Sequence, residues 1–173
     1  MKIAAAVALL LMTLPATGWA QAAPRRATLA IGYSALRETG DAPATYPAGW
    51  VVAVASAPAG GIGLVGEIGA NYRAPAGLRQ TLSSYQGGAR VALTGRLTGF
   101  VQFLAGLERF SEPGFQQNGF ALQPGGGVDV PITGRASLRG QADYRIVRVG
   151  GNPGRSGGTF KELRASVGIV IGF

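Results

Sequence analysis

Charged side chains recur at alternate positions of otherwise apolar segments in this 173-residue chain. Arg139, Asp143 and Arg145, for example, lie on one row of a segment whose other row is apolar. The whole set holds five acids and four bases: Glu67, Arg90, Glu108, Asp129, Arg139, Asp143, Arg145, Glu162 and Arg164. Because acids and bases nearly balance, we expect these side chains to form a network of buried ion pairs.

Histidine and cysteine are both absent from the chain. The sequence therefore excludes disulfides and thiolate metal sites, and it lacks the commonest general base and metal ligand. A serine nucleophile activated by histidine is excluded as well. We predict no enzymatic activity, no catalytic or metal site and no cofactor. A lipid-modifying enzyme is a disfavoured alternative.

Residues 61–66 read GIGLVG and match the pattern G-x-G-x-x-G. Dinucleotide binding through this pattern needs a following helix and an acidic residue about 20 positions further on. No helical pattern follows, and the next acid after Glu67 is Glu108. We interpret the motif as a turn that enters a strand.

The first 22 residues have the pattern of an export signal. Lys2 precedes an apolar stretch over 3–14, and Ala20-Gln21-Ala22 forms a small-residue cleavage site. The stretch is shorter than the roughly 20 residues of a transmembrane helix. We therefore predict a signal peptide over 1–22 and one exported domain over 23–173. Export argues against nucleic acid as the partner of this basic chain.

The exported part divides into eight segments in which apolar residues alternate with small or polar ones. They cover 27–35, 49–57, 63–73, 83–93, 97–108, 120–130, 137–147 and 162–173. The connections after the first, third, fifth and seventh segments are long, and the others are short. Pro124 interrupts the sixth segment and predicts a bulge or irregular pairing. Short turns at one end and long loops at the other are typical of transmembrane barrels.

The two faces of these segments predict an eight-stranded antiparallel up-and-down transmembrane β-barrel. The charged set lies on one face, which suits a narrow lumen filled by side chains. The opposite face is almost free of charge and suits lipid. Aromatic residues on it gather toward the long-loop ends, as in an interfacial girdle: Tyr33, Trp50, Tyr72, Tyr85, Phe120 and Tyr144. A soluble barrel with an apolar pocket, which would reverse the two faces, is the alternative.

Further basic residues lie in or beside the long loops, where few acids accompany them. They are Arg37, Arg73, Arg79, Arg109, Arg148, Arg155 and Lys161. If these loops face outward, the guanidinium groups would meet the phosphates of lipopolysaccharide, which they bind well. The alternative is that they only make the loops soluble.

Several short sequences carry a family resemblance by their order and spacing: GLVGE at 63–67, FVQFLAG at 100–106, GGGVD at 125–129, residues 138–144, and the terminal IGF. Together they resemble the small outer-membrane β-barrel proteins related to the OmpA transmembrane domain, OmpX and the opacity-type barrels. The resemblance implies insertion by the barrel assembly machinery, which in this family recognises a last strand ending in an aromatic residue, here Phe173.

The resemblance implies no shared enzymatic activity. We expect a monomer in the bacterial outer membrane, in contact with lipid and lipopolysaccharide, with a filled lumen and a structural or surface-interaction role. A small-solute porin is the alternative.

Overall fold

The computed structural model describes residues 27–40, 43–56, 62–151 and 157–173, so the predicted signal peptide lies outside the described residues. Nine strands and a short 3-10 turn make up the structure: β1 (Ala27–Glu38), β2 (Thr45–Tyr46), β3 (Ala48–Ser56), β4 (Ile62–Arg73), η1 (Pro75–Gly77), β5 (Gln80–Thr94), β6 (Thr98–Glu112), β7 (Phe115–Pro131), β8 (Ala136–Val149) and β9 (Gly158–Gly172). Among these residues, no helix has the length and apolarity to cross a bilayer.

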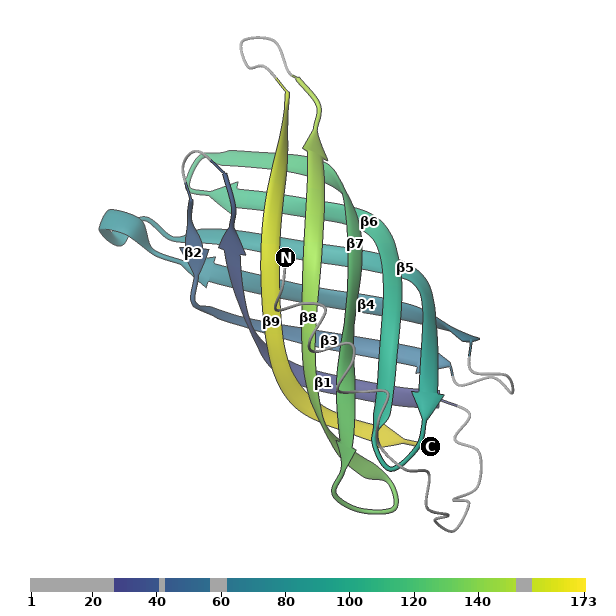
Figure 1. Ribbon diagram of the computed structural model, residues 1–173. Coiled ribbons are helices and arrows are strands. Elements are labelled where there is room, and N and C mark those ends of the chain that lie inside the picture. Colours follow the sequence, from purple (N-terminus) through teal and green to yellow (C-terminus); the bar gives the residue numbers. More distant parts are fainter. Residues whose placement is uncertain (1–26, 41–42, 57–61, 152–156) are drawn as a thin grey trace.

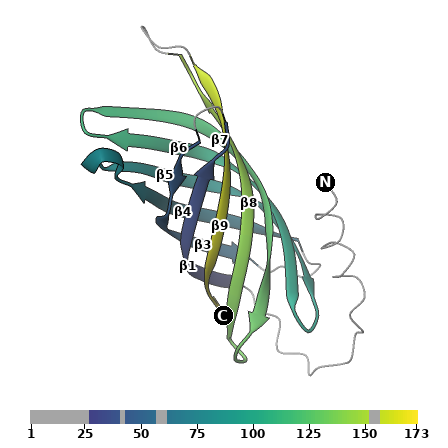
Figure 2. The ribbon, with the colours of Figure 1, turned by 60° about the vertical axis from the view of Figure 1, so that its left-hand side comes forward.

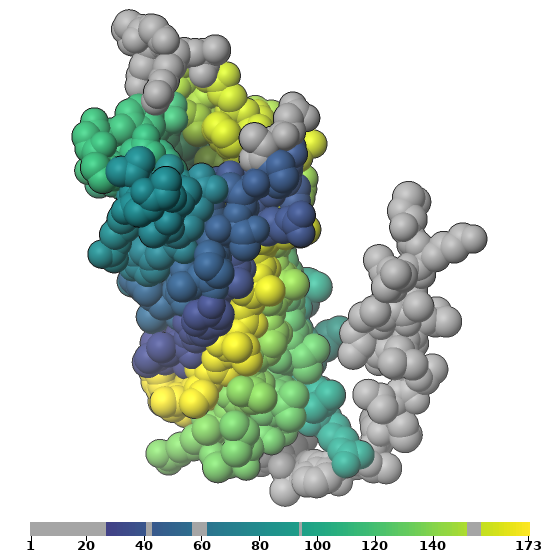
Figure 3. All heavy atoms as spheres, turned by 90° about the vertical axis from the view of Figure 1, so that its left-hand side faces the viewer, coloured from purple at the N-terminus to yellow at the C-terminus, as the bar shows by residue number. Residues whose placement is uncertain are grey.

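Every strand pairs antiparallel with its neighbours, and β9 pairs with β1 to close the sheet (Figure 1). The β2 and β3 strands both pair with β1 and form one wall segment, so the barrel is eight-stranded, as predicted. Closure continues to the end of the chain, where Ala27 and Phe173 exchange backbone hydrogen bonds of 3.1 Å. The space-filling view shows β1 and β9 lying side by side on a steep diagonal (Figure 3).

A bulge separates β2 from β3. Tyr33 pairs with Trp50, but Leu36 pairs with Tyr46, so one extra residue stands opposite β1 at Pro47. A bulge of this kind shifts the alternation of side chains by one position. As a result Tyr46 points inward and is fully buried, whereas Trp50 points outward and is 40% exposed. The predicted second strand, 49–57, is therefore longer and interrupted.

Side chains alternate across the wall as the sequence predicts. Large apolar residues cover the outside, with Leu64, Val101 and Ile169 all more than half exposed. The charged row points inward, where Glu67, Arg145 and Arg164 are at most 2% exposed. This polarity contradicts the soluble alternative, which needs an apolar interior.

We call the two ends of the barrel the turn end and the loop end. The turn end holds Ala27, Phe173 and the short connections 95–97 and 132–135. At the loop end, one predicted long loop is wrong. Residues 109–119 continue β6 and β7 into a hairpin that projects from the wall (Figure 2). Its two-residue connection is Pro113-Gly114, and Gly114 has a φ of 77°, which suits a type II turn.

Pro124 interrupts the β7–β8 ladder as predicted. Leu122 pairs with Ile146 and Gly125 with Asp143, and no pairing with β8 exists between them. The register is the same on both sides, so the interruption adds no residue and is not a bulge. Gln123 and Pro124 remain paired with β6, which keeps this part of the wall in place.

Candidate functional site: the lumen and the basic band

The middle of the lumen is crossed by Arg164 of β9. Its Nη2 donates to Glu67 Oε1 at 2.6 Å and to Asp143 Oδ2 at 2.7 Å. All three side chains are at most 3% exposed. Glu67 comes from β4 and Asp143 from β8, so one guanidinium group joins opposite walls of the barrel.

Glutamine amides occupy the remaining hydrogen-bonding positions of this layer. Gln123 Nε2 donates to Glu67 at 3.1 Å, and Gln141 Nε2 donates to Asp143 Oδ2 at 2.9 Å. Gln102 Nε2 donates to Asp143 at 3.3 Å, and Gln102 Oε1 accepts two hydrogen bonds from Arg90. Each buried carboxylate thus has several donors, which offsets the cost of removing it from water.

An aromatic ring organises the layer nearer the turn end. Arg90 and Arg139 lie over the ring of Phe100, at 4.2 and 4.5 Å from its centroid. Arg139 also forms a bidentate salt bridge with Asp129, in which Nε donates to Oδ1 at 2.7 Å and Nη2 donates to Oδ2 at 2.8 Å. Arg90 has no carboxylate partner among the described residues, so its predicted ion pair is wrong. Its charge is stabilised by Phe100 and by the Gln102 amide oxygen.

Arg145 of β8 forms the layer nearer the loop end. Its Nη1 donates to both Glu108 and Glu162, and its Nε donates to Gln123 at 3.0 Å. Two carboxylates therefore share one guanidinium nitrogen. Arg145 Nη2 is buried and has no partner among the described residues.

Beyond Arg145 the lumen opens into a cavity of about 220 Å³, which we call the loop-end cavity. Every wall segment of the barrel contributes to it. Its lining comprises Glu38, Tyr46, Arg73, Leu82, Glu108, Phe110, Phe115, Gln117, Gly119, Val147, Val149, Phe160 and Glu162. The same inward rows that fill the lower lumen with paired charges thus leave space here.

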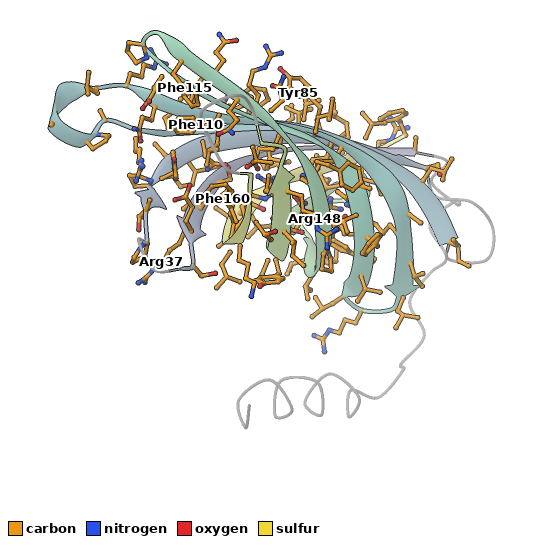
Figure 4. All side chains as sticks on the ribbon, turned by 90° about the horizontal axis from the view of Figure 1, so that it is seen from above. Arg37, Tyr85, Phe110, Phe115, Arg148 and Phe160 are labelled. Carbon is orange, nitrogen blue, oxygen red and sulfur yellow. The ribbon has the colours of Figure 1, made fainter. Side chains whose placement is uncertain are left out.

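The structure brings all nine residues of the predicted charge network into the lumen. It separates the predicted lipopolysaccharide contacts into several groups. Arg37, Arg109, Arg148 and Lys161 are exposed on the outer face at the loop end, and we call these four the basic band. Figure 4 shows Arg37 pointing away from the barrel.

The remaining predicted contacts lie elsewhere. Arg73 lines the loop-end cavity, with its guanidinium 4.7 Å from the centre of the Tyr46 ring and its Nε 2.5 Å from Gln80 Oε1. It is therefore not an outward contact, because the alternation of β4 directs it inward. Arg79, in the β4–β5 connection, stacks at 5.3 Å on Tyr72. Arg155 lies outside the described residues.

Two other predicted features can be placed. Phe173 is 67% exposed at the turn end. In the GIGLVG motif, Gly61 lies outside the described residues, and the rest belongs to β4, which runs on as a strand to Arg73. The helix that a dinucleotide site needs does not follow. No group of three or more acidic side chains among the described residues could hold a metal ion.

No family model matches the chain, and no curated protein does. Solved structures do match its fold. Neisserial surface protein A superimposes with a TM-score of 0.71 at 13% identity, over 85% of this chain and 97% of that one. The chain has the fold of the small outer-membrane β-barrels.

Two further structures agree with this fold. The attachment invasion locus protein Ail of Yersinia pestis matches with a TM-score of 0.56 at 16% identity, over 85% of this chain and 97% of Ail. The N-terminal β-barrel domain of Pseudomonas aeruginosa OprF matches with a TM-score of 0.56 at 12% identity, over 84% of this chain and 97% of the domain. At such identities the likeness concerns the fold alone.

The predicted network included only charged residues and left out the neutral members of the lumen. Gln102, Gln123 and Gln141 lie on the inward rows, and their alternation with apolar residues is a signal that could have found them. Phe100 breaks the polar pattern of its row, and its role became visible only when Arg90 and Arg139 proved to lie beside it. The loop-end cavity had no sequence signal, because it depends on residues from every wall segment.

Proposed function

We propose that this protein is an integral outer-membrane barrel with a sealed lumen, and that its basic band binds the phosphate groups of lipopolysaccharide. Its role on this proposal is structural or surface-interacting and not catalytic. The basic band carries the proposal, because it is the feature of the outer surface with a defined chemical preference.

The outer surface supports a membrane location. Exposed apolar side chains cover the wall, and an exposed surface of this extent is unfavourable in water but favourable in lipid. Tyr33, Trp50 and Tyr85 are outward-facing and exposed between this surface and the basic band, where a headgroup girdle is expected, and the exposed Phe120 pairs with Arg148 of the band itself. The three structural neighbours are outer-membrane proteins, which agrees with this location.

The cations of the basic band are available for a ligand. Arg37, Arg148 and Lys161 have no salt bridge among the described residues, and Arg109 donates only to Asn118 at 2.9 Å. The acids of the described strands belong to the inward rows. No described carboxylate therefore competes with an external phosphate for these cations.

Strand register places Lys161 between two of the other cations, Arg37 and Arg148. Arg37 pairs with Leu163, and Lys161 stands two positions further along β9. Lys161 pairs with Ile146, and Arg148 stands two positions further along β8. Diagonal neighbours of this kind are roughly 7–8 Å apart at the backbone, so Lys161 can share one phosphate group with either arginine.

The membrane location is tested by fractionation and a heat-modifiability gel. We expect the protein in the outer-membrane fraction, with boiled and unboiled samples migrating differently. Identical migration, with the protein in the soluble periplasm, would contradict the proposal.

The basic band is tested with the triple variant R37Q/R148Q/K161Q and a matched control, R96Q/R135Q. The control removes two exposed cations at the turn end. Each charge-assisted contact contributes about 1.5–3 kcal/mol, so the triple variant should bind lipopolysaccharide vesicles at least about a hundredfold more weakly. The control should bind like wild type. A similar loss per removed charge in the two variants would reduce the effect to net charge and overturn the assignment.

A soluble polyanion offers a second readout. Ail has been crystallised with the heparin analogue sucrose octasulfate. If the basic band recognises clustered anionic groups, this compound should compete with lipopolysaccharide for the wild-type protein and lose that effect on the triple variant. Competition that survives in the triple variant would place anion binding elsewhere.

Assembly provides a separate expectation. On the family resemblance, deletion of Phe173 should reduce the amount of folded barrel in the outer membrane, measured as the heat-modifiable fraction. The matched control is Phe160→Leu, since Phe160 is an exposed ring at the other end of the same strand. Normal insertion of the Phe173 deletion would contradict the assembly role.

A further inference from the structure

The loop-end cavity combines an acidic floor with aromatic walls. Glu38 and Glu162 stand directly opposite each other where β1 pairs with β9, and both line the cavity. Like charges opposite each other on paired strands are destabilising. The cavity thus carries an unfavourable arrangement that a bound cation would relieve.

The cations of the protein itself do not neutralise these carboxylates fully. Glu162 shares Arg145 Nη1 with Glu108, and no other base in the described part of the chain forms a salt bridge with either carboxylate. Glu38 has no salt bridge among the described residues and accepts only from the Tyr46 hydroxyl, at 3.4 Å. Arg73 is in the wall and attracts Glu38 electrostatically, but its direct contacts are with the Tyr46 ring and the Gln80 side chain. Three carboxylates therefore face two guanidinium groups around this cavity.

Aromatic rings form the walls above this floor. Phe110 and Phe115 belong to the β6–β7 hairpin, with ring centroids 6.1 Å apart. Phe160 comes from β9 and is 48% exposed. Figure 4 shows Phe110 and Phe115 near each other at the hairpin, with Phe160 toward the middle of the barrel mouth. Ring faces attract cations and also pack against apolar groups.

We propose that the loop-end cavity binds a small organic cation, an ammonium group attached to an aryl or short alkyl body. The ammonium group would lie between Glu38 and Glu162, and its apolar body would lie against Phe110, Phe115 and Phe160. The volume of about 220 Å³ is below the roughly 300–1,000 Å³ of drug-sized pockets, so it suits a single ring. A metal ion is disfavoured because the described carboxylates form no metal-binding group.

The test uses the folded protein in a non-ionic glucoside detergent, since zwitterionic detergents carry ammonium groups that would compete. Three probes of similar shape differ in charge: benzylammonium, benzyl alcohol and benzoate. Isothermal titration should show benzylammonium binding at least about tenfold more tightly than benzyl alcohol, with no binding of benzoate. Equal binding of the cation and the alcohol, or tighter binding of benzoate, would overturn the proposal. This comparison needs no variant.

Variants then locate the site. Glu38→Gln should weaken benzylammonium binding about tenfold, as expected for loss of one charge-assisted contact, and leave benzyl alcohol unchanged. Glu112→Gln is the control, because Glu112 accepts from Gln80 at 2.8 Å but does not line the cavity. Equal effects of these two substitutions would overturn the placement of the ammonium group.

The aromatic wall is tested in the same way. Phe160→Leu should weaken benzylammonium binding several-fold through loss of the cation–π contact. Phe120→Leu is its control, since Phe120 is a half-exposed ring on the outer face. An unchanged affinity of Phe160→Leu, with each variant shown to be folded by heat-modifiability, would contradict the aromatic contact.

Discussion

The lower lumen and the loop-end cavity are built from the same alternating rows of the same strands, yet they differ in chemistry. In the lower lumen Arg164 joins Glu67 and Asp143, and amides supply further donors to both carboxylates. In the loop-end cavity Glu38 and Glu162 face each other, with aromatic walls around them. The difference shows that the same inward rows form a polar core in one half of the lumen and leave an open cavity in the other, the site of the proposed binding.

The layer of Arg145 separates these two regions. Its Nη1 donates to Glu108 and Glu162, which line the cavity, and its Nε donates to Gln123, which belongs to the lower lumen. Together with Arg164 and Arg139 it places guanidinium groups across the barrel at successive levels. On the proposed sealed lumen, a narrow barrel filled in this way leaves no continuous aqueous path, which is the argument against the porin alternative.

The largest loss of stability in the lower lumen is expected from a substitution of Arg164. Arg164→Met would leave Glu67 and Asp143 as buried carboxylates without their shared cation. We expect a loss of about 3–5 kcal/mol in the free energy of unfolding, measured by urea titration in lipid vesicles free of lipopolysaccharide. Arg148→Met, an exposed cation of β8, should change it by less than about 0.5 kcal/mol. Similar values for the two variants would show that the network is not a core.

A smaller effect is expected at Gly125, where a Cβ atom would overlap the carboxylate of Asp143. Gly125→Ala should therefore displace Asp143 and lower the free energy of unfolding by about 1–3 kcal/mol. Gly66→Ala is the control, because a Cβ atom there meets nothing within 4 Å. If Gly125→Ala is as stable as this control, the lower lumen is less tightly packed than the structure indicates.

The smallest of these effects is expected at Phe100, whose ring lies beside both Arg90 and Arg139. Phe100→Leu keeps an apolar side chain but removes the π face, and should cost about 1–2 kcal/mol. Phe103→Leu changes an outward ring that is 54% exposed and provides the control. Indistinguishable unfolding curves would show that the ring acts only as apolar filling.

Alternation of side chains was sufficient to predict the eight-stranded barrel and the orientation of its faces. This signal is strong because each strand separates lipid from a charged lumen. The β6–β7 hairpin beyond Glu108 was missed because a projecting strand needs no apolar row, and residues 111–118 have none. The bulge at Pro47 was missed for a related reason, since only the pairing with β1 reveals the extra residue.

The site shows the same limit of sequence reasoning. The charged rows identified every ionised member of the network, but the sequence could not assign partners across the barrel. Arg90 was therefore given an ion pair that the structure replaces with Gln102 and Phe100. Arg73 was counted among the residues in or beside the long loops, although the predicted segment 63–73 already ends at it, on the same row as Glu67. The structure shows that this row points inward to its last residue.

Single-channel recording in planar bilayers tests the sealed lumen most directly. We expect a flat current trace from bilayers that contain the wild-type protein, with a heat-modifiability gel showing that the added protein is folded. Reproducible stepwise conductance from the wild-type barrel would contradict it, since ions would then pass the layers of Arg139, Arg164 and Arg145.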